Sequence, residues 1–181
     1  MERRSVFSAL AAGMAAQGAT FKNSFAEAFL KSFVAHWVDT REYTLAVLDA
    51  MPADKFTSKA NPAQRSFGEQ MLHLASANNA YFRGFDLVPP PEMRAPDAAN
   101  KEAVRGFVVA GFDFTDAVLA KMTEKDVLRT DIKFSPRLPA HSAVDIFLRA
   151  YMHTAHHRGQ IITYLRVNEI KPPTWKFEPH A

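Results

Sequence analysis

Apolar side chains recur every three or four residues in four separate stretches of the chain, and this spacing limits its fold more than any other property. Such a period places the apolar side chains along one face of an α-helix. The stretch from 24 to 51 carries its large apolar side chains at Phe25, Phe29, Phe33, Trp37, Leu45, Leu48 and Met51. Similar stretches begin at residues 66, 100 and 142. The sequence therefore predicts four long helices, each with one face to bury.

Residues typical of helix ends mark the limits of these stretches. A serine with an acidic residue three positions later is typical of a helix N-terminus. Such pairs begin the first, second and fourth stretches: Ser24 with Glu27, Ser66 with Glu69, and Ser142 with Asp145. Asn100 is the expected N-cap of the third helix, which we expect to end near Met122. Prolines at 52, at 89–91 and at 172–173 exclude continuation of the other three helices.

Amphipathic helices of this kind, joined by long connections, are typical of a four-helix bundle. We therefore predict an all-α fold, a four-helix bundle with long crossover connections, over residues 21–181. A helical repeat array is disfavoured because no segment repeats at a fixed period. The stretch 132–134 is expected to form at most a short extended segment. Trp175 and Phe177 follow the last helix, and we expect them to pack back onto the bundle.

Residues 1–20 have the order of a targeting segment. They begin with Met1-Glu2-Arg3-Arg4, continue with an apolar stretch over 6–16 and end with small residues. This order resembles a secretory signal, and the arginine pair followed by Phe7 resembles a twin-arginine signal. The other interpretation is an alanine-rich leader or the first turn of a helix. A cleaved signal predicts a periplasmic or exported protein, whereas a retained segment is compatible with the cytoplasm.

The chain contains no cysteine. This excludes disulfide scaffolds, zinc ribbons, iron–sulfur clusters and cysteine nucleophiles, so any metal site must use His, Asp and Glu. The formal net charge of +3 is small, and the Lys and Arg residues are scattered rather than gathered in the dense stripe that nucleic acid binding needs. No apolar run reaches the roughly 18–20 residues that a membrane span requires. We therefore expect neither a nucleic acid partner nor a membrane span.

Three of the seven histidines are placed where helices can bring them together. His153 and His157 are four residues apart on the fourth helix, so their side chains leave the same face and can chelate one divalent ion. His156 points roughly 100° away from His157, but it could replace His157 in a pair with His153. His73 lies on the second helix between apolar neighbours, which suggests that it faces the bundle interior. Three imidazoles would leave coordination positions open, as in catalytic metal sites.

Two segments around these histidines resemble the signature segments of the DinB family, part of the DinB/YfiT-like superfamily of metalloenzymes. They are residues 65–73, Arg-Ser-Phe-Gly-Glu-Gln-Met-Leu-His, and residues 153–160, His-Thr-Ala-His-His-Arg-Gly-Gln. The resemblance extends through Leu-Arg-Val-Asn-Glu-Ile at 165–170 to the prolines at 172–173. It implies a four-helix bundle, often a homodimer, that holds a divalent metal with His73, His153 and His157. His156 stands at a position that is often acidic in the family.

Five further residues are candidates for a supporting role near the metal: Glu69, Asn78, His156, Arg158 and Gln160. Glu69 could act as a hydrogen-bond acceptor or general base, although its capping-box position favours a structural role. Arg158 and Gln160 could orient a substrate, or they could form a structural ion pair or surface hydrogen bond. Asn78 and Asn79 are poor helix formers in the middle of the second helix, which suggests that one of them lines a pocket near the metal.

The resemblance implies a divalent-metal-dependent enzyme that acts on a small-molecule substrate, of the thiol-dependent transferase or hydrolase type. No catalytic residue is assigned beyond the metal ligands. Zinc or nickel is the favoured metal, with iron, manganese or copper as alternatives, since imidazole suits several of these ions. The competing hypothesis is a non-catalytic metal-binding or stress-associated bundle whose metal only stabilises the fold.

Overall fold

The computed structural model describes residues 18–175, with side chains from residue 25 onward, and this part of the chain contains four long helices. They are α2 (Gly18–Ala50), α3 (Phe67–Arg83), α4 (Lys101–Lys121) and α6 (Ala143–Val167). A short 3-10 turn, η1 (Ala53–Lys55), follows α2, and a short helix, α5 (Glu124–Val127), follows α4. The predicted all-α four-helix bundle is confirmed.

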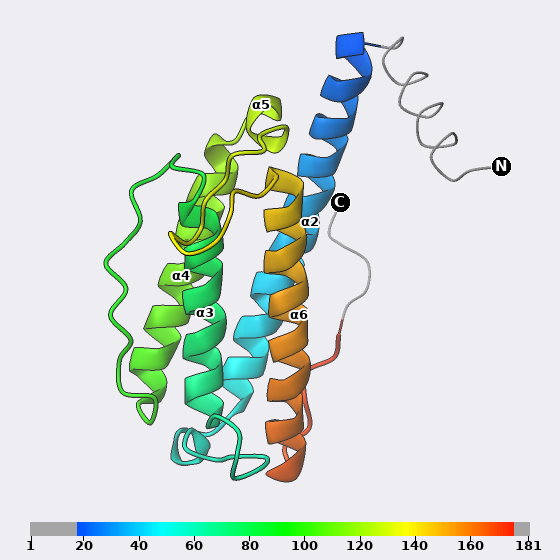
Figure 1. Ribbon diagram of the computed structural model, residues 1–181. Helices are drawn as coiled ribbons and strands as arrows, with labels where there is room; N and C mark the ends of the chain where they lie inside the picture. Colours follow the sequence, from blue (N-terminus) through cyan, green and yellow to red (C-terminus); the bar gives the residue numbers. More distant parts are fainter. Residues whose placement is uncertain (1–17, 176–181) are drawn as a thin grey trace, which may run out of the picture.

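Helices α2 and α6 run in one direction, and α3 and α4 run in the other (Figure 1). Because α3 and α4 are parallel, the segment between them returns along the outside of the bundle, and this is one of the predicted crossovers. Gly68 on α3 makes room for it, since a Cβ at this position would lie 1.9 Å from the carbonyl oxygen of Ala98. Helix α3 packs against both α4 and α6, so α3 and α6 are direct neighbours.

Three of the four predicted helix starts are confirmed by their caps. The Ser66 hydroxyl accepts a hydrogen bond from the backbone N–H of Glu69, and the Glu69 carboxylate accepts one from the N–H of Ser66 at 2.6 Å. Asn100 caps α4 and Ser142 caps α6 in the same way, through side-chain oxygens that accept from backbone N–H groups. Each cap satisfies donors that the first helical turn cannot pair internally.

The predicted start of the first helix is wrong, because α2 begins at Gly18 and continues through Ser24. A capping signature begins a helix only where the preceding residues leave the helical conformation, and nothing in the residues before Ser24 breaks a helix. The predicted leader falls mainly on residues 1–17, which lie outside the described residues. The division of the chain near residue 20 therefore stays a prediction.

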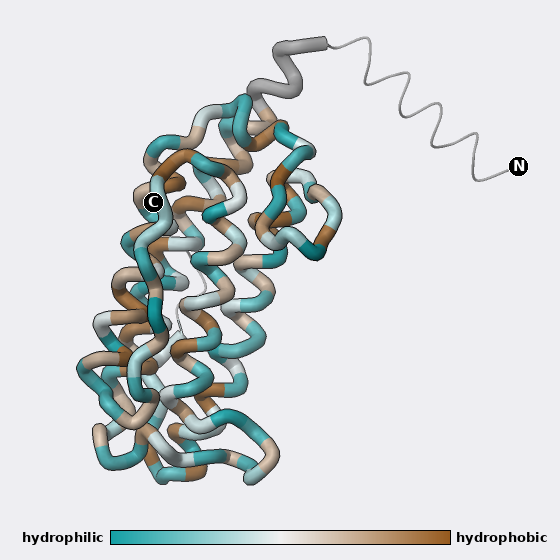
Figure 2. The backbone as a smooth tube through the Cα atoms, turned by 60° about the vertical axis from the view of Figure 1, so that its left-hand side comes forward, coloured by the Kyte–Doolittle hydropathy of each residue, from teal (hydrophilic) through white to brown (hydrophobic). Residues whose placement is uncertain are grey.

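Aromatic side chains from several helices form the centre of the bundle. The Trp37 side chain, 1% exposed, contacts the rings of Phe33, Phe82 and Phe112, and Phe147 from α6 contacts Phe33. Hydrophobic and hydrophilic residues are interspersed along each helix, as the colours of Figure 2 show. No helix in residues 18–175 combines the length and apolar character needed to cross a membrane.

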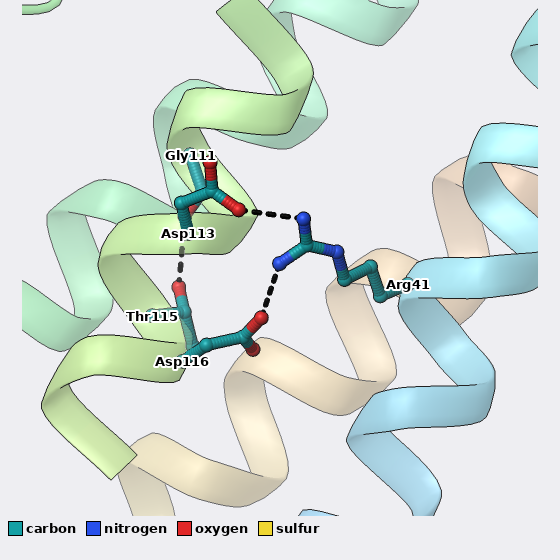
Figure 3. Close-up of polar contacts among 5 residues, drawn as sticks. All are labelled: Arg41, Gly111, Asp113, Thr115 and Asp116. Atoms are coloured by element: carbon teal, nitrogen blue, oxygen red, sulfur yellow. Dashed lines mark hydrogen bonds and ion pairs between the residues drawn. The ribbon is translucent and has the colours of Figure 1, made fainter. Parts of the chain in front are cut away.

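An ion-pair cluster joins α2 to α4 at the surface. The guanidinium of Arg41 binds the carboxylates of both Asp113 and Asp116, and the Thr115 hydroxyl donates a hydrogen bond to the carbonyl of Gly111 one turn earlier on α4 (Figure 3). One cation thus bridges two carboxylates on successive turns of the neighbouring helix. These pairs add a polar contact between α2 and α4 to the packing of the two helices.

The connection from α4 to α6 and the C-terminal segment agree with their predictions. Ile132 pairs with His141 in an isolated antiparallel bridge, so the extended stretch is indeed short. After α6, the Trp175 ring packs 4.8 Å from the Tyr43 ring, and the Tyr43 hydroxyl donates a hydrogen bond to the Pro173 carbonyl. Trp175 therefore packs back onto the bundle as predicted, and Phe177 lies outside the described residues.

Candidate metal centre

Three histidines from two helices meet where α3 packs against α6. The ring centroids of His73 and His157 lie 4.5 Å apart, those of His153 and His157 lie 4.3 Å apart, and those of His73 and His153 lie 5.1 Å apart. One nitrogen from each ring lies within 4.8 Å of the other two. These are the three histidines that the sequence predicts to share an ion, and their nitrogens lie close enough together to hold one.

Helical geometry explains why these rings converge. His153 and His157 lie one turn apart on α6 and so present both rings to the same neighbour. His73 lies near the middle of α3, whose start is fixed by the capping box of Ser66 and Glu69. Helices α3 and α6 run antiparallel in contact, and the His73–His157 ring contact shows that the middle of one lies opposite the middle of the other. The packing of α3 against α6 therefore brings the ring of His73 to those of His153 and His157.

The cluster is open to solvent on one side. His157 is buried, with 8% of its surface exposed, whereas His73 and His153 are partly exposed. The sequence predicts a site within the bundle core, and the structure instead places the cluster at the edge of the core, along the α3–α6 contact. Two of the three rings can therefore be reached from solvent.

The environment of the cluster favours neutral imidazoles. Burial lowers the pKa of His153 and of His157 to about 4, with smaller contributions from the neighbouring histidines. Burial also lowers the pKa of His73, and the positive charge of Arg65 contributes to this shift. A histidine must be neutral to offer a lone pair to a metal. All three rings are therefore in the ligating form at neutral pH.

One polar atom in the cluster lacks a partner within the described protein. Nδ1 of His153 is buried and forms no hydrogen bond. A buried polar atom without a partner is costly, and a metal ion is one way to satisfy it. The group consists of imidazoles alone, which is a donor set that suits zinc, nickel, copper and iron. The residues present thus fit a divalent transition metal.

A chain of side-chain hydrogen bonds supports His157, and one of its members was not anticipated. The buried Gln70 contacts Nδ1 of His157 through its Oε1, and it donates from Nε2 to Gln160, which in turn contacts His156. Gln160 and His156 are sequence candidates, but Gln70 is not. The signal for Gln70 was its position three residues before His73, on the same face of α3.

The other sequence candidates have partners elsewhere. The Glu69 carboxylate closes the capping box with Ser66, which also lowers its pKa. Asn78 is buried and accepts a hydrogen bond from the Thr154 hydroxyl at 3.1 Å, so it joins α3 to α6. These contacts involve none of the three histidines.

Arg158 lies on a different side of α6 from the histidine cluster. Its guanidinium stacks over the rings of Trp175, at 4.4 Å, and of Tyr43, at 5.1 Å. The side chain is 5% exposed, and its Nη1 forms no hydrogen bond in the described structure. Arg158 therefore holds the segment that follows α6, although it is adjacent to a proposed ligand in sequence.

Tyr81 forms one wall beside the cluster. Its ring lies 5.9 Å from the His153 ring and 5.0 Å from that of Phe134, which belongs to the connection between α5 and α6. Burial raises the pKa of the Tyr81 hydroxyl, so the group stays protonated at neutral pH. A neutral phenol at this place can donate a hydrogen bond toward a bound molecule.

A helical bundle with three clustered histidines on adjacent helices is a protein suited to metal binding. The chain belongs to the DinB superfamily, whose family model matches residues 36–161. This range contains all three histidines and the Gln70 and Gln160 side chains, and it confirms the resemblance identified from the two signature segments.

Solved structures agree with this assignment at the level of the fold. A DinB-like protein from Bacillus cereus matches with a TM-score of 0.69 and 20% identity, over 80% of this chain and 95% of that chain. A DinB-like protein, YjoA, from Bacillus subtilis matches with a TM-score of 0.62 and 17% identity, over 81% and 99%. No curated protein matches the sequence.

Proposed function

We propose that the protein is a metal-dependent enzyme that holds one divalent ion with His73, His153 and His157. The observation that carries this proposal is the convergence of three imidazole nitrogens within 4.8 Å, with no carboxylate in the group. The lowered pKa of each ring and the unpartnered Nδ1 of His153 support it. The partial exposure of two of the three rings favours a catalytic role, because a purely structural site is usually closed.

A divalent ion held by three imidazoles supplies a Lewis acid with open positions, at which a water or a thiol becomes acidic near neutral pH. The protein residues hold the ligands and shape the entrance. Gln70 orients His157 through the hydrogen bond at Nδ1. Tyr81, whose ring lies beside that of His153, can donate a hydrogen bond to a substrate oxygen. The reaction class we propose is a thiol-dependent transfer or a hydrolysis on a small-molecule substrate.

We propose that the metal is zinc or nickel. The alternatives are iron, manganese and copper. Metal analysis of the protein purified from its native host identifies the ion that the cell loads. The variant His153→Ala should then lose the metal, because it removes one of three ligands. An unchanged affinity for one equivalent of metal in this variant would contradict the ligand assignment.

The competing function is a metal that only stabilises the bundle. One observation favours it: the ligands come from two helices, so an ion would join α3 to α6. The two functions are separated by comparing the melting temperature with turnover. A structural ion predicts a large loss of melting temperature in His153→Ala and no metal-dependent activity on thiol or ester substrates. A catalytic ion predicts metal-dependent turnover, with a smaller change in melting temperature.

We further propose that the protein is a homodimer. Support comes from large apolar side chains that stay exposed on α2 and α6, with Phe25 at 47%, Leu148 at 51% and Met152 at 67%. Beside them lies a groove of about 210 Å³ that is mainly apolar, lined in part by Phe29, Leu148 and Tyr151. Light scattering should give twice the chain mass, and the variant Leu148→Glu should give a monomer. A monomeric parent protein would contradict this proposal.

The proposed division at residue 20 remains to be tested by N-terminal sequencing of protein from the native host. A cut there would remove only the first three residues of α2, Gly18 to Thr20, and it would leave the family-matched range intact. A mature N-terminus near residue 21 supports an exported protein. An N-terminus at the initial methionine supports a retained segment.

A further inference from the structure

Gln70 uses both ends of its side-chain amide beside the histidine cluster. It lies on α3 and is 3% exposed. Its Oε1 lies 3.1 Å from Nδ1 of His157, and its Nε2 donates to Oε1 of Gln160 at 3.1 Å. Nε2 of Gln160 lies 3.1 Å from Nε2 of His156. Four side chains thus form a continuous hydrogen-bonded chain from the exposed His156 to the buried His157.

The chemistry of the amides gives this chain a direction. An amide oxygen only accepts a hydrogen bond, so Nδ1 of His157 must carry the proton that it donates to Gln70. An amide nitrogen only donates, so Nε2 of His156 must be the acceptor of the bond from Gln160. Reversing one amide alone would place two donors or two acceptors together at the next link, and reversing both would exchange the tautomers of both histidines, so the orientation that the structure gives the two amides sets the direction. The two histidines at the ends therefore take defined tautomers together.

We propose that Gln70 is a positioning residue that fixes His157 as the Nδ1–H tautomer and so reserves its Nε2 for the metal. This inference rests on the proposed function, in which His157 is a ligand. A neutral imidazole carries its proton on one nitrogen, and the hydrogen bond at one nitrogen decides which nitrogen can ligate. Gln160 holds Gln70 in turn, because it accepts from the end of the amide that does not face His157.

The placement of Gln70 suits this role better than that of any of the five candidates that the sequence suggests. It lies one turn before His73 on α3, so one helix provides both a ligand and the support of a second ligand. Because His157 comes from α6, the Gln70–His157 bond also orients its ring across the helix contact. Replacing Gln70 should therefore alter the nitrogen that His157 offers, without removing any ligand.

The first experiment measures tautomers in the metal-free, full-length protein by nitrogen-15 NMR of its histidine side chains. His157 is expected to carry its proton on Nδ1, and His156 is expected to do the same. In Gln70→Leu, which keeps the approximate side-chain size but removes the acceptor, His157 is expected to shift toward the Nε2–H tautomer. A wild-type His157 that carries its proton on Nε2 would overturn the proposal.

The second experiment measures zinc affinity by competition with a chelator. Gln70→Leu should lower the affinity by about 10-fold to 100-fold, the usual effect of losing the hydrogen-bond partner of a metal ligand. Gln70→Glu keeps an acceptor at the same place and should retain the affinity. Gln64→Leu is the matched control, since it removes an exposed glutamine amide outside this hydrogen-bonded chain, and it should change the affinity little. Equal affinities for wild type and Gln70→Leu would overturn the proposal.

The two experiments separate this inference from the proposed function. A wild-type protein that binds no zinc, nickel or other divalent ion refutes the metal centre, whereas the tautomer of His157 in the metal-free protein still tests Gln70. Should Gln70→Leu fold poorly, Gln70→Glu keeps the test open. A Gln70→Glu protein whose His157 loses the Nδ1–H tautomer contradicts the role assigned to the acceptor.

Discussion

The rings of His73 and His157 meet edge to face, 4.5 Å apart, although 84 positions separate the two residues in the sequence. Their contact joins the middle of α3 to the middle of α6. An ion shared by these rings would bind the folded protein and not the unfolded chain, because only the folded bundle brings them together. Metal affinity and stability are therefore linked through this pair.

The variant His73→Ala should abolish most of the stabilisation that metal gives. In the wild-type protein, zinc at about 100 times its dissociation constant should raise the free energy of unfolding by about 2.7 kcal/mol. The variant keeps only the two ligands of α6, so the added zinc should raise its melting temperature far less. Thermal melts with and without zinc make the comparison, and an equal rise in both proteins would exclude His73 as a ligand.

The metal-free protein should lose stability as the pH falls from about 6.5 to about 4. Burial lowers the pKa of His153 and His157 from the ordinary 6.5 to about 4 in the folded state. The unfolded chain therefore binds more protons in this range, and stability rises with pH across it. The stability that the neutral His153 and His157 give the folded state is fully present above pH 6.5, and it is lost as the pH falls through about 4.

Urea unfolding at several pH values between 4 and 7 measures this dependence. Replacing both histidines, as in the double variant His153→Gln with His157→Gln, should flatten the curve in that interval. The carboxylates that also titrate there are common to both proteins, so the difference between the two curves isolates the histidines. Parallel curves for the two proteins would contradict the lowered pKa values.

Local signals explain which parts of the fold the sequence predicts well. Ser66, Asn100 and Ser142 each cap a helix within three residues of themselves, and the residues around them are sufficient to identify the cap. Ser24 has the same local pattern but lies inside α2, because the chain before it also forms helix. The capping-box pattern alone does not distinguish a serine that begins a helix from one that lies inside a helix.

In the candidate site too, the sequence predicts the features that local spacing determines and misses those that depend on helix packing. The spacing of His153 and His157 indicates a chelating pair, since one turn of a single helix sets their separation. The role of Gln70 depends on the distance between α3 and α6, which no spacing within one helix encodes. The reverse holds for Asn78 and Asn79, since the sequence suggests that one of them lines a pocket near the metal. The structure gives Asn78 a buried hydrogen bond to Thr154 and places Asn79 in the lining of a pocket that includes none of the three histidines.

The crossover between α3 and α4 depends on the absence of a side chain at Gly68. A Cβ at this position would lie 1.9 Å from the backbone oxygen of Ala98, so Gly68→Ala must displace the crossover or α3. We expect a loss of about 1–3 kcal/mol in the free energy of unfolding, as for overpacked sites in general. Gly106→Ala on α4 is the matched control, because its Cβ would meet nothing within 4 Å. Since alanine favours helix over glycine, this control should gain about 0.5–1 kcal/mol in urea unfolding, and equal losses in both variants would refute the close-approach argument.

Arg158 should control how firmly the segment after α6 is held. Its buried guanidinium stacks on Trp175 and Tyr43, and desolvation lowers its pKa. Arg158→Met keeps most of the side-chain volume but removes the charge, which should weaken the docking of Trp175 by about 0.5–2 kcal/mol. Limited proteolysis should then cleave the C-terminal segment of the Arg158→Met protein faster. Arg166 is exposed on the same helix, so Arg166→Met serves as the control and should leave the cleavage rate unchanged.

The zinc affinity of the Arg158→Met protein should equal that of the wild type, because Arg158 contacts none of the three histidines. A large loss of affinity in this variant would instead assign Arg158 to the metal centre.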